Sequence, residues 1–101
     1  MDKKYESAEG LSPDPLEDAR AEIDNIDRLL LDLLAWRARV SERIGAIKRG
    51  RGQPVADPGR EAAILARMAA LARPPLPPES AAMIWEAIFE ASRAIQSAEK
   101  H

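Results

Sequence analysis

One helical pattern of unusual length constrains the fold of this chain more than any other feature. From position 16 to position 47, apolar residues recur at steps of three and four, which places side chains on one face of an α-helix. They are Leu16, Ala19, Ile23, Ile26, Leu30, Leu33, Val40, Ile44 and Ile47. A helix of about 34 residues, from about Leu16 to about Arg49, is about 50 Å long. A compact domain of 101 residues has a diameter of only about 33 Å.

Two shorter helices are predicted after the long one. The second begins at Pro58 and runs to about Ala72. The proline-rich segment RPPLPPES separates it from the third, which begins at about Pro78, within that segment, and runs to Ala98. Asp14 and Asp57 are candidate N-caps, because each stands before a proline in the first helical position. Gly50 and Gly52 are predicted to end the first helix.

The whole chain is therefore predicted to be an all-α protein with a single helical domain. That domain covers residues 15–101, and residues 1–14 are predicted to form a flexible N-terminal arm, because Gly10, Pro13 and Pro15 interrupt regular structure there. Two short helices cannot cover the apolar stripe of the first. A kink near Trp36 or Gly45 would let a monomer fold back, but the stripe continues on both sides of both positions. We therefore expect an intertwined homodimer.

Composition excludes several classes of function. The net charge of -2 and the pI of about 5.4 provide no basic excess for nucleic acid or an anionic membrane. The chain has no cysteine, and its one histidine is the last residue, His101, so thiol chemistry, a histidine metal site and a catalytic triad are not expected. No stretch resembles a membrane span or the apolar core of a signal peptide. We predict a cytoplasmic protein without metal or cofactor.

Polar residues lie on the apolar faces of all three predicted helices. Arg37 interrupts the stripe of the first helix, and Lys48, eleven residues later, is offset from it by only about 20°. Glu61 extends the stripe of the second helix, and Ser92 and Gln96 extend that of the third. Each of these polar residues, taken alone, can be explained without a binding site; Lys48 and Glu61, for example, suit the helix dipole at their ends of the helices. Together they predict a polar pocket suited to a small anion that also carries a hydroxyl group.

Arg20 offers a further cation for such a site. It lies 17 residues before Arg37, about 25 Å away along one helix, so one small ligand cannot touch both residues of a single chain. In an antiparallel dimer, Arg20 of one protomer can approach Arg37 of the other, and two guanidiniums suit a dicarboxylate. The alternative is a surface pair between Arg20 and Asp24.

Three segments resemble the all-helical class of chorismate mutase: ARAEIDNIDRLLLDLLAWRARVSERIGAIK, PVADPGRE and EASRAIQ. The resemblance covers about residues 16–97 and implies an intertwined dimer of three-helix chains that rearranges chorismate to prephenate in aromatic amino-acid biosynthesis. It implies eight substrate-binding residues: Arg20, Arg37, Lys48, Asp57, Arg60, Glu61, Ser92 and Gln96.

The resemblance also implies the role of each residue. Arg37 binds one substrate carboxylate, Arg20 of the partner chain binds a carboxylate in the same site, and Ser92 donates to the ring carboxylate. Lys48 and Gln96 bind the ether oxygen, and Lys48 also a carboxylate. The ring hydroxyl is surrounded by three residues, of which Glu61 is the strongest match: Asp57, Arg60 and Glu61. The residues implied to act in catalysis are Lys48, Gln96, Arg37 and Glu61.

The sequence leaves three alternatives open. Isochorismate-pyruvate lyases and 4-amino-4-deoxychorismate mutases share the scaffold, and the carboxylate of Glu61 suits an ammonium group as well as a hydroxyl. The third alternative is a non-catalytic helical dimerisation module, in which the inward polar residues form structural ion pairs.

Overall fold

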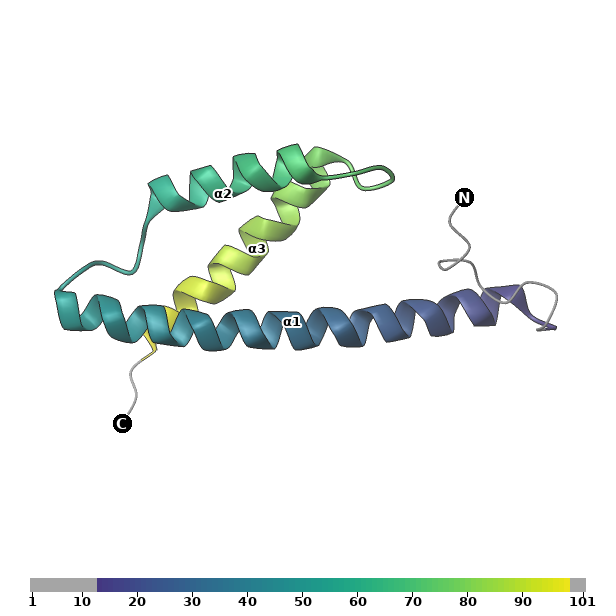
Figure 1. The fold of residues 1–101 in the computed structure, drawn as a ribbon, viewed down its shortest axis with the longest axis horizontal. Helices are drawn as coiled ribbons and strands as arrows, with labels where there is room; N and C mark the ends of the chain where they lie inside the picture. Colours follow the sequence, from purple (N-terminus) through teal and green to yellow (C-terminus); the bar gives the residue numbers. More distant parts are fainter. Residues whose placement is uncertain (1–12, 99–101) are drawn as a thin grey trace. The chain divides into compact units, whose positions relative to one another are not determined.

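The computed structural model describes residues 13–98, and within them the chain forms three α-helices and no strand. They are α1, Pro15–Arg51; α2, Pro58–Leu71; and α3, Pro78–Ser97 (Figure 1). The predicted all-α chain with a long first helix is confirmed, and each predicted helix end lies within two residues of the observed one. Most of the predicted N-terminal arm, residues 1–12, lies outside the described residues.

The chain divides into two units at a point inside α1. The first unit ends at Arg37, so its helical part is Pro15 to Arg37. The second unit begins at Ala38 and contains the last part of α1 together with α2 and α3. The helix is continuous at both Trp36 and Gly45, the two places where a break was considered.

Side-chain and backbone caps define the ends of α1. Oδ1 of Asp14 accepts hydrogen bonds from the backbone N–H groups of Leu16 (3.0 Å) and Glu17 (3.3 Å), which confirms the predicted N-cap. At the other end, the N–H of Gln53 donates to the carbonyl of Lys48 (2.9 Å), and Gly52 adopts a left-handed φ of 65°. This is a Schellman motif.

The prediction that Gly50 also ends the first helix is wrong. Gly50 lies inside α1, and the helix ends one residue later, at Arg51. A Schellman motif requires a left-handed residue only at the position after the helix, which here is Gly52. Gly50 has helical neighbours on both sides and no need of that conformation.

The second unit has a small core, built where α3 meets its neighbours. Ala81 and Phe89 of α3 are buried, with exposed fractions of 2% and 4%. Ser41 and Gly45 of α1 are buried as well, and so is Ser92 of α3. Two of these five buried residues carry hydroxyl groups, so this core is partly polar.

The apolar stripe of the first unit is exposed in the single chain. Ile23, Leu30 and Leu33 have exposed fractions of 56%, 51% and 57%, and Leu29 and Trp36 beside the stripe are similarly exposed. Burying a large apolar side chain adds about 1.5–3 kcal/mol to the free energy of unfolding. The exposed side chains of this stripe do not make that contribution in the single chain. Within residues 13–98, no helix is both long and apolar enough to cross a membrane.

Candidate active site

Lys48 and Gln96 form a hydrogen-bonded pair between α1 and α3. Nζ of Lys48 donates to Oε1 of Gln96 at 2.8 Å and to the backbone carbonyl of Val55 at 2.8 Å. Both side chains are half-buried. An ammonium group has three N–H donors, so one donor of Lys48 remains beyond these two bonds.

The bond to Lys48 fixes the orientation of the Gln96 amide. An ammonium group can only donate, so the side-chain oxygen of Gln96 faces Lys48 and its NH₂ group is directed elsewhere. The remaining N–H of Lys48 and the NH₂ of Gln96 are therefore neighbouring donors. Two adjacent donors, one of them cationic, suit an oxygen that develops negative charge.

The backbone of Gln96 is fixed by contacts with α1. Nη1 of Arg49 donates to the carbonyls of Gln96 (3.1 Å) and Ala98 (3.5 Å), which satisfies carbonyl groups at the C-terminal end of α3. Gly45 lies directly against the same residue, and a Cβ placed there would be 2.8 Å from the Gln96 carbonyl oxygen. The absence of a side chain at Gly45 therefore permits the close approach of the two backbones.

Ser92 lies one helical turn before Gln96 on α3. Its Oγ accepts a hydrogen bond of 3.3 Å from Oγ of Ser41 on α1, and both residues are buried. Since residues four apart share a helix face, Ser92 and Gln96 extend one polar line along α3, beside Lys48. The structure thus brings together three of the predicted site residues.

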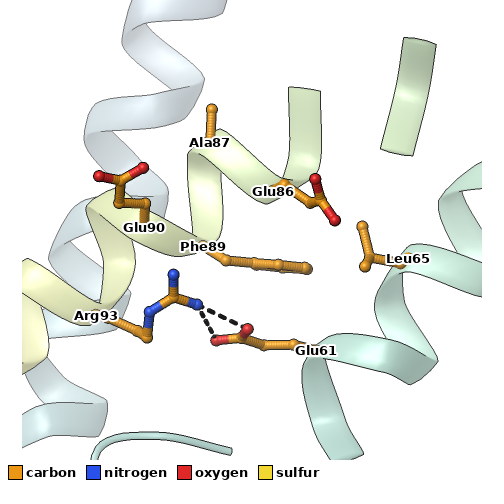
Figure 2. Close-up of a pocket in the computed structure, with 7 residues that line it drawn as sticks. All are labelled: Glu61, Leu65, Glu86, Ala87, Phe89, Glu90 and Arg93. Atoms are coloured by element: carbon orange, nitrogen blue, oxygen red, sulfur yellow. Dashed lines mark hydrogen bonds and ion pairs between the residues drawn. The ribbon is translucent and has the colours of Figure 1, made fainter. Parts of the chain in front are cut away.

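Glu61 of α2 forms an ion pair that the sequence did not predict. Nη1 of Arg93 on α3 lies 2.7 Å from both Oε1 and Oε2 of Glu61, and the pair borders an open groove of about 430 Å³ (Figure 2). The other lining residues are Leu65, Glu86, Ala87, Phe89 and Glu90. Arg93 follows Ser92 in the chain, so this pair joins α2 to the helix that carries Ser92 and Gln96.

Asp57 and Arg60 lie at the start of α2. Oδ1 of Asp57 accepts a hydrogen bond from the backbone N–H of Arg60 at 3.1 Å, which confirms Asp57 as the N-cap of the helix. Both residues are exposed. One oxygen of the Asp57 carboxylate therefore serves the helix, and the other is available to a ligand.

Arg20 and Arg37 both belong to the first unit. Nη1 of Arg20 pairs with Oε1 of Glu17 at 3.1 Å, and both side chains are 64% exposed. The alternative partner considered for Arg20 was Asp24; the observed partner lies on the preceding turn instead. Arg37 is half-buried. The positions of these two arginines relative to the second unit stay a prediction.

Three residues near the candidate site were missed at the sequence level: Ser41, Arg49 and Arg93. Arg93 and Arg49 fall beside the apolar stripes, where a cation normally faces water, and Ser41 is a small residue typical of helix crossings. Gly45 was considered only as the place of a possible kink in the first helix. The signal available in the sequence was adjacency to predicted site residues: Arg93 directly follows Ser92, and Arg49 directly follows Lys48.

A helical protein with cationic and amide donors on its inward faces belongs to the class in which side chains from several helices form a small-molecule site. Residues 19–97 match the family described as chorismate mutase type II. The chain therefore belongs to the chorismate mutase type II family.

Solved structures of chorismate mutases resemble this chain over most of its length. The form II structure from Thermus thermophilus has a TM-score of 0.83 and 31% identity, and the match covers 87% of this chain and 100% of that one. Chorismate mutase from Helicobacter pylori in complex with prephenate has a TM-score of 0.74 and 36% identity, with coverage of 80% and 88%.

Curated relatives match over a shorter region. The T-protein of Haemophilus influenzae is 42% identical over 50 residues, and that of Enterobacter agglomerans 45% identical over 47 residues. These matches cover 50% and 46% of this chain. The chain spans only 13% of the length of each T-protein.

Proposed function

We propose that this protein is a chorismate mutase, which rearranges chorismate to prephenate. The observation that carries the proposal is the bonded pair of Lys48 and Gln96, 2.8 Å apart, in a chain of the chorismate mutase type II family. The reaction is an intramolecular [3,3] shift, in which a C–O bond breaks while a C–C bond forms. Negative charge grows on the departing ether oxygen.

Lys48 and Gln96 act on that ether oxygen. Their remaining N–H donors are fixed before the substrate arrives, because Oε1 of Gln96 and the carbonyl of Val55 already occupy the other donors of Lys48. A preorganised donor of this kind typically contributes about 3–4 kcal/mol to transition-state stabilisation. No nucleophile is needed for a unimolecular rearrangement.

The remaining residues hold the substrate in its compact, reactive shape. Arg37 and the Arg20 of the partner protomer bind the two carboxylates, and Ser92 donates to the ring carboxylate. The ring hydroxyl is contacted by three residues at the start of α2: Asp57, Arg60 and Glu61. Fixing a flexible substrate near its reactive geometry supplies much of the catalysis in such reactions.

The site is completed by an intertwined homodimer. Support comes from the exposed stripe of the first unit, where Ile23, Leu30 and Leu33 are all more than half exposed and a second copy of the stripe is a matching apolar surface. Arg20 lies on the same helical segment. Pairing of this segment with its copy in a second protomer would therefore allow Arg20 of one protomer to reach the site of the other. The single domain of residues 15–101 and the cytoplasmic location stay predictions.

The test is a spectroscopic assay of chorismate disappearance with identification of the product. We expect prephenate, and we expect Gln96→Ala to lower kcat by about 10²–10³-fold while circular dichroism and the dimer are unchanged. Arg67→Ala, an exposed change on α2, is the control and should keep full activity.

Other outcomes would contradict the proposal in distinct ways. Pyruvate released from isochorismate would identify a lyase on the same scaffold. Faster turnover of 4-amino-4-deoxychorismate would identify the amino-substrate mutase. A folded dimer that turns over none of the three substrates would identify a dimerisation module.

A further inference from the structure

The ion pair between Arg93 and Glu61 has no part in the roles described so far. Both carboxylate oxygens of Glu61 lie 2.7 Å from Nη1 of Arg93, a distance typical of strong, charge-assisted hydrogen bonds. The side chains are 42% and 27% exposed. Figure 2 shows the guanidinium and the carboxylate facing each other between α3 and α2.

We propose that Arg93 positions Glu61 and makes the substrate site select a hydroxyl group over an ammonium group at the ring position that Glu61 contacts. The proposal deepens the proposed function and rests on it, since it requires Glu61 to face the ring substituent. Arg93 is a positioning residue here, because it acts through Glu61.

The first part of the argument concerns geometry. A glutamate side chain has three rotatable torsions, and the two short bonds to Arg93 restrict them to one arrangement. A carboxylate offers about four lone-pair sites, and Arg93 occupies two of them. The remaining sites can accept a hydrogen bond from a substrate hydroxyl, and their direction is set by the ion pair.

The second part concerns charge. Of the described residues that line the groove, Arg93 is the one cation, and three are acids: Glu61, Glu86 and Glu90. A hydroxyl group needs only an acceptor, and the paired Glu61 still provides one. An ammonium group gains most from an uncompensated carboxylate and is repelled by a nearby guanidinium. Glu61 paired with Arg93 therefore attracts an ammonium group less strongly than an unpaired Glu61 would, which shifts the preference towards the neutral substituent.

Removal of Arg93 should reverse this balance. The variant Arg93→Met keeps the length of the apolar stem and leaves Glu61 without its paired cation, in a groove whose other charged residues are Glu86 and Glu90. We measure kcat/KM with chorismate and with 4-amino-4-deoxychorismate, and compare the ratio of the two values. The wild-type protein should favour chorismate, and Arg93→Met should shift the ratio towards the amino substrate by about 10–100-fold, the size of one hydrogen bond to a charged group.

Further variants separate positioning from mere stabilisation. Arg93→Lys keeps the cation and should retain most of the wild-type ratio, whereas Arg93→Gln removes the charge and keeps a polar group, so it should behave like Arg93→Met. In a Glu61→Gln background, Arg93→Met should change the ratio little, because the effect passes through Glu61. Arg67→Met on α2 is the matched control.

Two failures are distinguishable. If the wild-type protein produces no prephenate, the proposed function is wrong. If it produces prephenate but Arg93→Met and Arg93→Gln lower kcat/KM equally for both substrates, Arg93 is a structural ion-pair partner and this inference is overturned. A wild-type preference for the amino substrate would overturn it as well. If Arg93→Met does not fold, the substrate ratios of Arg93→Gln and Arg93→Lys are compared instead and test the same inference.

Discussion

Replacement of Gly45 by alanine tests the contact that places Gln96 beside Lys48. The added Cβ would lie 2.8 Å from the carbonyl oxygen of Gln96 and 2.9 Å from its Cα. Both are backbone atoms, so no side-chain rotation relieves the overlap. The backbones of α1 and α3 must separate by roughly half an ångström or more to restore ordinary van der Waals contact.

The expected effect on stability is small because two contributions oppose each other. Overpacking of this kind typically costs about 1–3 kcal/mol, and alanine is favoured over glycine in a helix by about 1 kcal/mol. The net change in the free energy of unfolding is therefore a loss of about 0–2 kcal/mol. Thermal unfolding by circular dichroism, at one fixed protein concentration, measures it.

The expected effect on activity is larger. Separation of α1 from α3 should lengthen the 2.8 Å bond between Lys48 and Gln96 and turn both donors away from the position proposed for the ether oxygen. A misplacement of about 1 Å can cost about 10²-fold in rate, so we expect Gly45→Ala to lower kcat/KM for chorismate by about 10–100-fold, a loss that its stability does not account for.

Gly50→Ala is a matched control on the same helix. Outside its own stretch of helix, no atom lies within 4 Å of the Cβ that it would add, so it should raise stability by up to about 1 kcal/mol and leave kcat/KM unchanged. If Gly45→Ala were as active and as stable as Gly50→Ala, the close approach of α1 to Gln96 would not matter for the site, and the reasoning above would be refuted.

Two other predictions concern the dimer and the start of α2. Arg20→Ala and Arg37→Ala should each abolish most activity as homodimers, but co-refolding equal amounts should restore about one quarter of wild-type activity, because each mixed dimer regains one intact site and half of the dimers are mixed. Persistent inactivity of the mixture would contradict donation of Arg20 in trans. Asp57→Ala should lower the free energy of unfolding by about 1 kcal/mol, while Asp57→Asn should keep it, since asparagine caps a helix as well as aspartate; equal melting temperatures for the two variants would contradict the capping role.

The helix ends were predictable because their signals are local. Asp14 and Asp57 cap residues two and three positions ahead, and the glycine that ends α1 adjoins the helix that it terminates. A cap can therefore be recognised within one short stretch of sequence. The same reasoning wrongly assigned Gly50 a role in ending α1, because the sequence alone does not reveal which of two nearby glycines adopts the left-handed conformation.

The partners of the site residues were not predictable in the same way. The periodicity indicated that Glu61 and Ser92 face inward; in the structure Ser92 is buried, and Glu61 is part-exposed at the edge of an open groove. Their contacts, however, join residues 32 and 51 positions apart in the chain. Which side chains meet across two helices depends on the crossing angle and on the register of the helices, and neither quantity is encoded in the period of a single helix.

The connection between α1 and α2 has a consequence for protein engineering. Surface loops normally accept inserted residues with little penalty. Here the backbone N–H of Gln53 and the carbonyl of Val55 both bond to Lys48, one to its main chain and one to its ammonium group. Peptide tags, loop extensions and circular permutations placed between positions 52 and 57 would therefore disturb the position of the Lys48 ammonium group, so fusion partners are better joined elsewhere.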